Sequence, residues 1–255
     1  MLFNWERQVA NLQQACDAHI RGNSLDDSSP SPPSLLTLLQ VQKQCLELRA
    51  TRPNVTVPPV ELTLYYESLC PGCRDFITQQ LYPTWTLLRD ILRVNLVPYG
   101  NAKEMQNAVI CQHGEPECHV NLVEACILHT TSHEAFHVIN CMESASDVLT
   151  AAQSCLQLFA PSVRWENISS CVRGPLGRSL IHENAAKTRA LNPAHTHVPW
   201  VTFNGMYTDE LEDQAMSSLF HLVCSLYKVG LSLLHKSNHS RKATYFRVCV
   251  CVWLC

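Results

Sequence analysis

The sequence is poor in charged residues and contains no long apolar run. Charged residues make up 16% of its 255 positions, and the formal net charge is −3. No run of basic residues and no interleaving of basic with aromatic residues occurs, so we expect no nucleic-acid partner. The longest apolar candidate for a membrane span, residues 246–255, is about half as long as a spanning helix must be. We therefore expect no membrane span either.

A secretory leader is also not evident. Residues 1–22 are polar and amphipathic, and the apolar segment at 35–39 is too short and too far into the chain for a normal signal peptide. We interpret the first residues as an atypical or misassigned start. The cysteine content nevertheless favours the secretory route, because fourteen cysteines are typical of a protein in an oxidising compartment. Three sequons agree with that compartment, and their glycosylation candidates are Asn54, Asn167 and Asn238.

The most informative motif is Cys70-Pro71-Gly72-Cys73. It follows the strand-like run 60–67 and precedes a long amphipathic stretch, so it lies where a strand leads into a helix. A helix N-terminus favours a thiolate, and two intervening residues allow the sulfurs to form a disulfide. The motif could instead be half of a zinc site. The flanking elements and the lack of a second C-x2-C motif favour a redox pair.

The chain divides by composition into three parts. Residues 1–59 form an N-terminal extension with a Ser/Pro/Asp-rich linker, residues 60–228 form the domain, and residues 229–255 form a divergent tail. Apolar residues recur at helical spacing after Cys73, with Pro83 expected to kink or split that helix. Residues 93–99 read as a second buried strand, which gives a parallel strand–helix–strand unit.

Residues 103–193 read as a helical insertion. This region shows several short helical patterns and no strong strand signal, and disulfides are expected to pin it. Residues 197–205 then predict a strand that ends in an Asn-Gly hairpin turn. An amphipathic pattern over 211–227 predicts a closing helix.

A second motif carries a resemblance to a known family. The stretch Cys111-Gln-His-Gly-Glu-Pro-Glu-Cys118-His-Val-Asn121-Leu-Val-Glu-Ala-Cys126 resembles the signature of the gamma-interferon-inducible lysosomal thiol reductase (GILT) family. Segments 64–70, 96–102, 155–161 and 198–202 are also similar to that family. The likeness covers roughly residues 60–228. The sequence departs from the family in three ways. The family's usual signal peptide is missing, the stretch between Ala102 and Cys111 is shortened, and the tail does not match.

The resemblance implies an α/β fold with a thioredoxin-like core and a disulfide-rich helical insertion. It implies a thiol-disulfide oxidoreductase that reduces protein disulfides at acidic pH, as in endosomal and lysosomal antigen processing. Cys70 and Cys73 would be the catalytic pair. The expected partners are disulfide-bonded protein substrates and a small-thiol reductant, with no cofactor and no metal. The expected location is the lysosome or endosome, or outside the cell.

Acid activity places a demand on Cys70, which is expected to attack substrate before Cys73 resolves the mixed disulfide. An ordinary thiol with a pKa of about 8.5 is almost fully protonated at pH ~5. A three-unit decrease in pKa requires about 4 kcal/mol of preferential thiolate stabilisation. That exceeds what a helix dipole normally supplies, so hydrogen bonds from backbone N–H groups, including that of Cys73, are expected to add to it.

Val198 and Pro199 are the predicted substrate-binding residues. In thioredoxin-like folds a cis-proline begins the strand that faces the redox pair, which leaves the preceding backbone free to pair with an extended substrate. The alternative is a trans proline at the start of an edge strand. Structural disulfides are expected among the remaining domain cysteines, with undetermined connectivity: Cys111, Cys118, Cys126, Cys141, Cys155, Cys171 and Cys224.

Three alternatives to an acid-active reductase stay open from the sequence. The same scaffold could serve a disulfide oxidase or isomerase, which its reduction potential would reveal. The chain could be a non-catalytic, disulfide-stapled secreted binding protein whose redox motif is structural. Finally, Cys111, Cys118 and Cys126 with His113 and His119 could form a zinc module.

Overall fold

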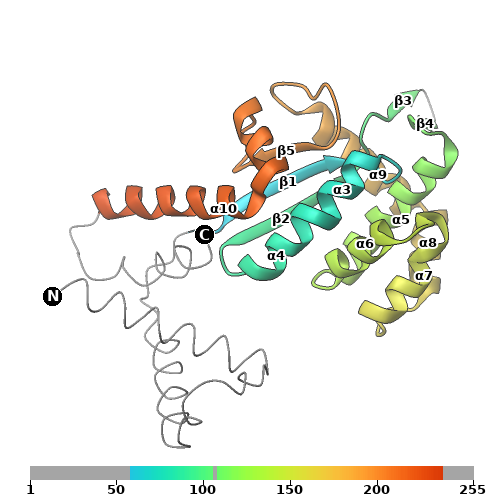
Figure 1. The fold of residues 1–255 in the computed structure, drawn as a ribbon. Helices are drawn as coiled ribbons and strands as arrows, with labels where there is room; N and C mark the ends of the chain where they lie inside the picture. The colour runs from blue at the N-terminus through green and yellow to red at the C-terminus, as the bar shows by residue number, and fades with distance from the viewer. Residues whose placement is uncertain (1–57, 106–107, 238–255) are drawn as a thin grey trace, which may run out of the picture. The chain divides into compact units, whose positions relative to one another are not determined.

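A three-stranded mixed sheet organises the domain in the computed structural model, which describes residues 58–105 and 108–237 (Figure 1). The strand order is β2-β1-β5. β1 (Val60–Tyr66) alternates buried with more exposed positions, as the period of a strand requires. It pairs in parallel with β2 (Leu92–Pro98) and antiparallel with β5 (Trp200–Phe203). The predicted parallel pairing of the first two strands is confirmed.

The connection between β1 and β2 is helical, with a change of helix type in its middle. It consists of α3 (Pro71–Asp75), the π-helical turn η1 (Phe76–Leu81) and α4 (Tyr82–Leu88). The Tyr82 N–H bonds the Ile77 carbonyl, five residues back. Pro83 follows directly and has no N–H to continue the ordinary ladder. The sequence predicted a kink or split at this proline, and the structure places a π turn just before it.

The insertion begins with two short strands that the sequence did not predict. β3 (Lys103–Met105) and β4 (Ala108–Ile110) pair antiparallel. The expectation of helices alone over 103–193 was wrong here, because strands of three residues are too short to show a clear alternation. Several helices follow, as predicted, although no helical pattern was singled out where α8 lies: α5 (Glu115–Thr131), α6 (Ala135–Ser144), α7 (Val148–Phe159), α8 (Trp165–Arg173) and α9 (Pro175–Arg189).

The insertion has its own apolar core, and disulfides cross it. Buried side chains of α5, α6, α7 and α8 pack together there. Two disulfides, Cys126–Cys171 and Cys141–Cys155, join helices of this core. A third, Cys111–Cys118, ties the end of the β3–β4 hairpin to the start of α5. Covalent links between distant segments restrict the unfolded chain, so they stabilise a core of modest size.

The domain closes with β5 and a long helix. Asn204 and Gly205 have positive φ and turn the chain after β5, as the predicted Asn-Gly turn requires. The return pairs through a single antiparallel bridge between Phe203 and Met206. α10 (Asp209–Ser237) contains a kink at Ser218, where the backbone leaves helical geometry. Residues 1–57 of the predicted extension (1–59) and residues 238–255 of the predicted tail (229–255) lie outside the described residues. α10 continues past the boundary predicted at residue 228.

The arrangement confirms the predicted α/β, thioredoxin-like fold with a helical insertion. A strand leads into the redox-motif helix, a parallel strand follows, and the inserted helices come before an antiparallel strand and a final helix. α5 and α9 contact β2, and α10 contacts β5. Within the described ranges, no helix combines the length and the apolar character needed to cross a bilayer.

Candidate active site

Cys70 lies at the junction predicted from the sequence, after β1 and directly before α3. Its backbone is extended, and it is the N-cap residue of α3, with Pro71 in the first helical turn. The Cys73 N–H donates to the Cys70 sulfur across 3.4 Å. Cys70 is partly exposed, whereas Cys73 is fully buried. Within the described residues these two are the free cysteines, so the pair is present in its reduced form.

The surroundings of the pair separate the acidities of its two thiols. A hydrogen bond from the Cys73 side chain is the largest cause that lowers the pKa of Cys70, from 9.0 to about 6. Backbone N–H groups of Cys73 and Gly72 and the charge of His113 lower this pKa further, against a desolvation penalty. Burial raises the pKa of Cys73, and its contact with Cys70 raises it more. Cys70 therefore loses its proton first.

Val198 and Pro199 lie against the redox motif. The Val198–Pro199 peptide bond is cis. The Val198 carbonyl lies 3.9 Å from the Cys70 sulfur and accepts from its thiol. Pro199 Cδ lies 3.6 Å from the point where a side chain at Gly72 would begin. The backbone of Val198 is thus beside the more exposed sulfur of the pair.

Helix α5 holds the loop between β1 and α3 through polar side chains on one face. Asn121 Oδ1 accepts from the Ser68 N–H at 2.9 Å, and Glu124 Oε2 accepts from the Tyr66 hydroxyl at 2.7 Å. Glu117, Asn121 and Glu124 are four and three residues apart, a spacing that places side chains on one side of a helix. All three are buried. The position of Cys70 therefore depends on the segment that contains the second sequence motif.

A cluster of two buried carboxylates and one imidazole lies beside Cys70. The Glu67 and Glu117 side chains are 1% and 0% exposed, whereas that of His113 is 38% exposed. His113 Nδ1 contacts Glu117 Oε2 and lies 3.5 Å from Glu67 Oε1. The Asn101 N–H donates to Glu67 Oε2 at 2.9 Å. We call Glu67, His113 and Glu117 the carboxylate–imidazole triad.

The triad has the character of an ion cluster. The hydrogen bond between His113 and Glu117 is the main cause that raises the pKa of His113, and the charges of Glu67 and Cys70 act in the same direction. Burial raises the pKa of Glu67. One ligand atom from each residue lies within 4.8 Å of the others, so a metal ion would fit by distance alone. However, His113 Nδ1 already faces both carboxylates, which favours a proton over a metal ion there.

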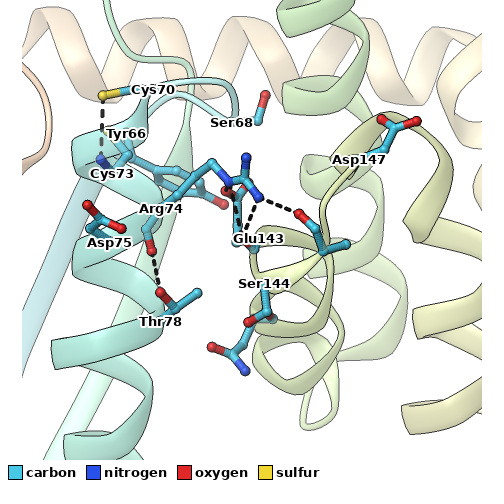
Figure 2. A network of polar contacts seen from close by, with 12 residues as sticks. Tyr66, Ser68, Cys70, Cys73, Arg74, Asp75, Thr78, Glu143, Ser144 and Asp147 are labelled. Carbon is cyan, nitrogen blue, oxygen red and sulfur yellow. Dashed lines mark hydrogen bonds and ion pairs between the residues drawn. The ribbon is translucent and has the colours of Figure 1, made fainter.

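On the other side of the motif, Arg74 joins α3 to the end of α6 (Figure 2). Its guanidinium donates to the Glu143 carbonyl at 2.9 Å and to the Ala145 carbonyl at 2.5 Å. Its Nε also lies 3.4 Å from the buried Glu143 carboxylate. Figure 2 shows the arginine side chain reaching from the redox helix across to the insertion. Pro71, Arg74 and Glu143 help line a shallow pocket at this place.

Glu143, the partner of this arginine, and Glu124 form a pair of buried carboxyls. Burial raises the pKa of Glu124 to about 7 and that of Glu143 to about 11. Each lies close enough to affect the other, and Tyr66 donates to Glu124. Two buried carboxyls in contact cannot both be charged at low cost, so the pair keeps at least one proton in acid and at neutral pH.

Comparison with known proteins identifies the family. Residues 61–159 match the family model described as gamma interferon inducible lysosomal thiol reductase (GILT). A protein from Carassius auratus named gamma-interferon-inducible lysosomal thiol reductase is 50% identical over 192 residues, 74% of each chain. This chain belongs to the GILT family.

Other relatives agree. A GILT protein of the same name from Mus musculus is 45% identical over 71% of this chain and 73% of its own length. The Arabidopsis thaliana protein named gamma-interferon-responsive lysosomal thiol protein is 40% identical over 71% of this chain and 76% of its own. Among solved structures, reduced DsbA1 from Neisseria meningitidis aligns with a TM-score of 0.43 and 10% identity over 71% of this chain and 93% of its own.

The GILT signature cysteines lie in disulfides, and they have no free thiol with which to ligate zinc. Cys111 pairs with Cys118, Cys126 with Cys171, and Cys141 with Cys155, while Cys224 is also disulfide-bonded. The zinc module built on Cys111, Cys118 and Cys126 is therefore wrong for this oxidised arrangement. Of the three glycosylation candidates, Asn167 is exposed on α8, whereas Asn54 and Asn238 lie outside the described residues.

Sequence reasoning missed the acidic residues around the pair. Glu67, Glu117, Glu124 and Glu143 were not singled out, although each is buried within the domain. A signal was present in the GILT signature, since Glu117, Asn121 and Glu124 place polar groups at helical spacing among the apolar residues that α5 buries. No local pattern marks Glu67 or Glu143 in the same way.

Proposed function

We propose that this GILT-family chain is an enzyme that reduces disulfide bonds of protein substrates, with Cys70 as nucleophile and Cys73 as the resolving thiol. The observation that carries the proposal is the free, half-exposed Cys70 sulfur held by the Cys73 N–H, with a pKa of about 6. The relatives' names, which describe lysosomal thiol reductases, support the same activity.

In the first step the Cys70 thiolate attacks one sulfur of the substrate disulfide. A Cys70–substrate bond forms, the substrate disulfide breaks, and the departing substrate thiolate takes a proton from solvent. In the second step Cys73 loses its proton and attacks Cys70. The Cys70–Cys73 disulfide forms, and the second substrate sulfur leaves as a thiol. The substrate gains two electrons and two protons, and the enzyme pair is oxidised.

A small-thiol reductant then restores the pair by two exchanges of the same kind. Two small thiols are oxidised to one disulfide while Cys70 and Cys73 return to the dithiol form. We propose a thiol of this class because Cys70 is the half-exposed sulfur of the pair. No bound cofactor is needed in this cycle, since sulfur supplies all the electrons.

Acidic conditions suit the Cys70 thiol. With a pKa of about 6, roughly a tenth of it is thiolate at pH 5, against about one part in ten thousand for a pKa of 9.0. We therefore propose that the chain acts in an acidic compartment of the endosomal and lysosomal route, which matches the relatives' names.

The Val198 backbone is the proposed docking edge for the substrate. Its carbonyl lies 3.9 Å from the Cys70 sulfur, and Pro199 packs toward Gly72 beneath it. An extended substrate segment that pairs with this backbone would present its cysteine beside Cys70.

An oxidase function is the second candidate, and the same low pKa of Cys70 supports it. Stabilising a thiolate favours the dithiol form and makes the disulfide a stronger oxidant. In acid this effect fades, because below pH 6 most of Cys70 carries a proton. A reduction potential near those of strong oxidants at pH 5 would favour the oxidase.

The direct test is the reduction of insulin disulfides between pH 4.5 and 7 by the wild type and by Cys70→Ser. We expect turnover by the wild type with a small-thiol reductant and none above background by Cys70→Ser. Equal rates for the two proteins would overturn the proposed activity. Wild type that only oxidises reduced substrates would replace it with the oxidase.

A further inference from the structure

In the carboxylate–imidazole triad, two buried carboxylates lie against one imidazole, that of His113. Glu67 and Glu117 are both buried and lie close enough to share one imidazole. Two buried anions side by side are unstable without a cation or a proton between them. His113 contacts both, and its exposed edge gives it access to protons from solvent.

The triad is held next to the proposed nucleophile, because the Cys70 N–H donates to the Glu67 carbonyl at 3.3 Å. The groups that face His113 are Glu117 at the start of α5, Glu67 in the β1–α3 loop and Cys70 at the cap of α3. Cys70 is faced in turn by Cys73, by Glu67 and by Glu143 of α6. These neighbours are acids, and Arg74 directs its guanidinium to the Glu143 and Ala145 carbonyls.

We propose that His113 is a positioning residue for the redox reaction: its protonated imidazole bridges Glu67 and Glu117 and supplies the positive charge that favours the Cys70 thiolate. This inference rests on the proposed function and assigns a role to the histidine of the GILT signature. His113 touches no substrate in this scheme, since it acts through the charge next to Cys70.

The choice of histidine gives the site a pH window. The pKa of His113 is raised above its usual 6.5, so the imidazole is charged throughout the acidic range. As the pH rises through the raised pKa, His113 becomes neutral and two buried carboxylates are left beside the sulfur. The Cys70 thiolate then loses the favourable positive charge of His113 and keeps the unfavourable negative charges of Glu67 and Glu117. A lysine or arginine could not switch off in this way.

The coupling is reciprocal, which provides a sharp test. If the charge of His113 lowers the pKa of Cys70, the Cys70 thiolate must raise the pKa of His113 by the same amount. We would measure the Cys70 midpoint from the pH dependence of iodoacetamide alkylation in the wild type and in His113→Gln. The His113 midpoint would be measured by NMR titration in reduced wild type and in Cys70→Ser.

The expected result is a matched pair of shifts. His113→Gln should lower the Cys70 alkylation rate at pH 5.5 by about three- to tenfold, a range that allows for the exposure of His113. At pH 8.5 the two proteins should react at the same rate, because Cys70 is then fully ionised in both. Damage to the fold would change the rate at both pH values.

Two more variants control the experiment. His119→Gln removes an exposed histidine from α5, the helix that follows His113, and it should leave both midpoints unchanged. Glu117→Gln keeps the oxygen that accepts from the His113 N–H but removes the negative charge. It should lower the His113 midpoint, and it allows the test to proceed if His113→Gln does not fold.

An unchanged Cys70 midpoint in His113→Gln, or an unchanged His113 midpoint in Cys70→Ser, would overturn the inference. So would a stoichiometric metal ion that wild type retains and His113→Gln loses, because a metal would then occupy the place of the proton. Insulin reduction by the same preparations distinguishes failure of the role of His113 from failure of the proposed function. If wild type reduces insulin but the midpoints are not coupled, only the role of His113 fails, whereas absent turnover removes the proposed function itself.

Discussion

The backbone N–H of Cys73 points at the sulfur of Cys70 from 3.4 Å. This single contact joins the two halves of the motif, because the residue that would resolve the mixed disulfide also stabilises the nucleophile. Pro71 has no N–H, so the stabilising donors come from Gly72 and Cys73. The short motif thereby supplies hydrogen-bond donors that stabilise the Cys70 thiolate in addition to the helix dipole.

The first prediction concerns the division of labour within the pair. Cys73→Ser retains the Cys70 nucleophile but cannot complete the second step, so it should accumulate a mixed disulfide with a protein substrate. Cys70→Ser should trap none, because Cys73 is buried. Non-reducing electrophoresis and mass spectrometry of the adduct would check this. Adducts linked to residue 73 in Cys70→Ser would reverse the assignment.

The second prediction concerns the link between the redox helix and the insertion. Arg74→Gln removes the bonds to the Glu143 and Ala145 carbonyls, and should lower the free energy of unfolding by about 1–3 kcal/mol. Arg93→Gln is the matched control, since its 3.7 Å pair with Glu61 is exposed and should be worth less than about 1 kcal/mol. Urea unfolding measures both, and equal losses would contradict this role of Arg74.

The third prediction uses two glycines of similar backbone geometry. Gly100 and Gly205 have φ values of +61° and +77°, so alanine strains the backbone at each by about 1–2 kcal/mol. At Gly100 a new Cβ would also lie 2.5 Å from the Glu67 Cβ, whereas nothing lies within 4 Å at Gly205.

Gly100→Ala should therefore destabilise the protein by at least about 1 kcal/mol more than Gly205→Ala. It should also shift the pH dependence of Cys70 alkylation, because Glu67 must move. Thermal unfolding and alkylation of the two variants would show this. Identical behaviour would mean that the loop adjusts without moving Glu67.

The fourth prediction concerns stability and pH. The folded pKa of Glu124 is about 7, raised from 4.5 by burial. A carboxyl with a raised folded pKa favours folding below its unfolded pKa, and this contribution is lost as the pH rises toward the folded value. Wild type should thus lose stability relative to Glu124→Gln between pH 4.5 and 7. Urea unfolding of the oxidised proteins, in which Cys70 does not titrate, would measure it, and a constant difference across this range would contradict it.

The sequence predicted those parts of the fold that have a local pattern. The alternation in β1 and the position of Cys70 between a strand and a helix are visible within a few residues of chain, and both are present in the structure. The parallel pairing of β1 with β2 followed from the helical connection between them. The three-residue strands β3 and β4 carry too little pattern to be found.

The surroundings of the nucleophile could not be predicted in the same way. Glu67 and His113 are distant in sequence and meet only because α5 packs beside the β1–α3 loop. Arg74 likewise bonds main-chain carbonyls near residue 143, which no side-chain pattern encodes. Sequence reasoning singled out Cys70 as the proposed nucleophile, whereas the ionisable groups around it became visible only in the folded chain.

The most direct test of the account is the acidity of Cys70 in the reduced wild-type protein. The rate of alkylation, or the thiolate absorbance, would be followed from pH 4 to 10, with Cys70→Ser as the blank for Cys73. We predict a midpoint near 6, as the contacts from Cys73, Gly72 and His113 require. A midpoint near the ordinary value of 9.0 would show that the folded chain does not stabilise this thiolate, and the proposed chemistry in acid would be contradicted.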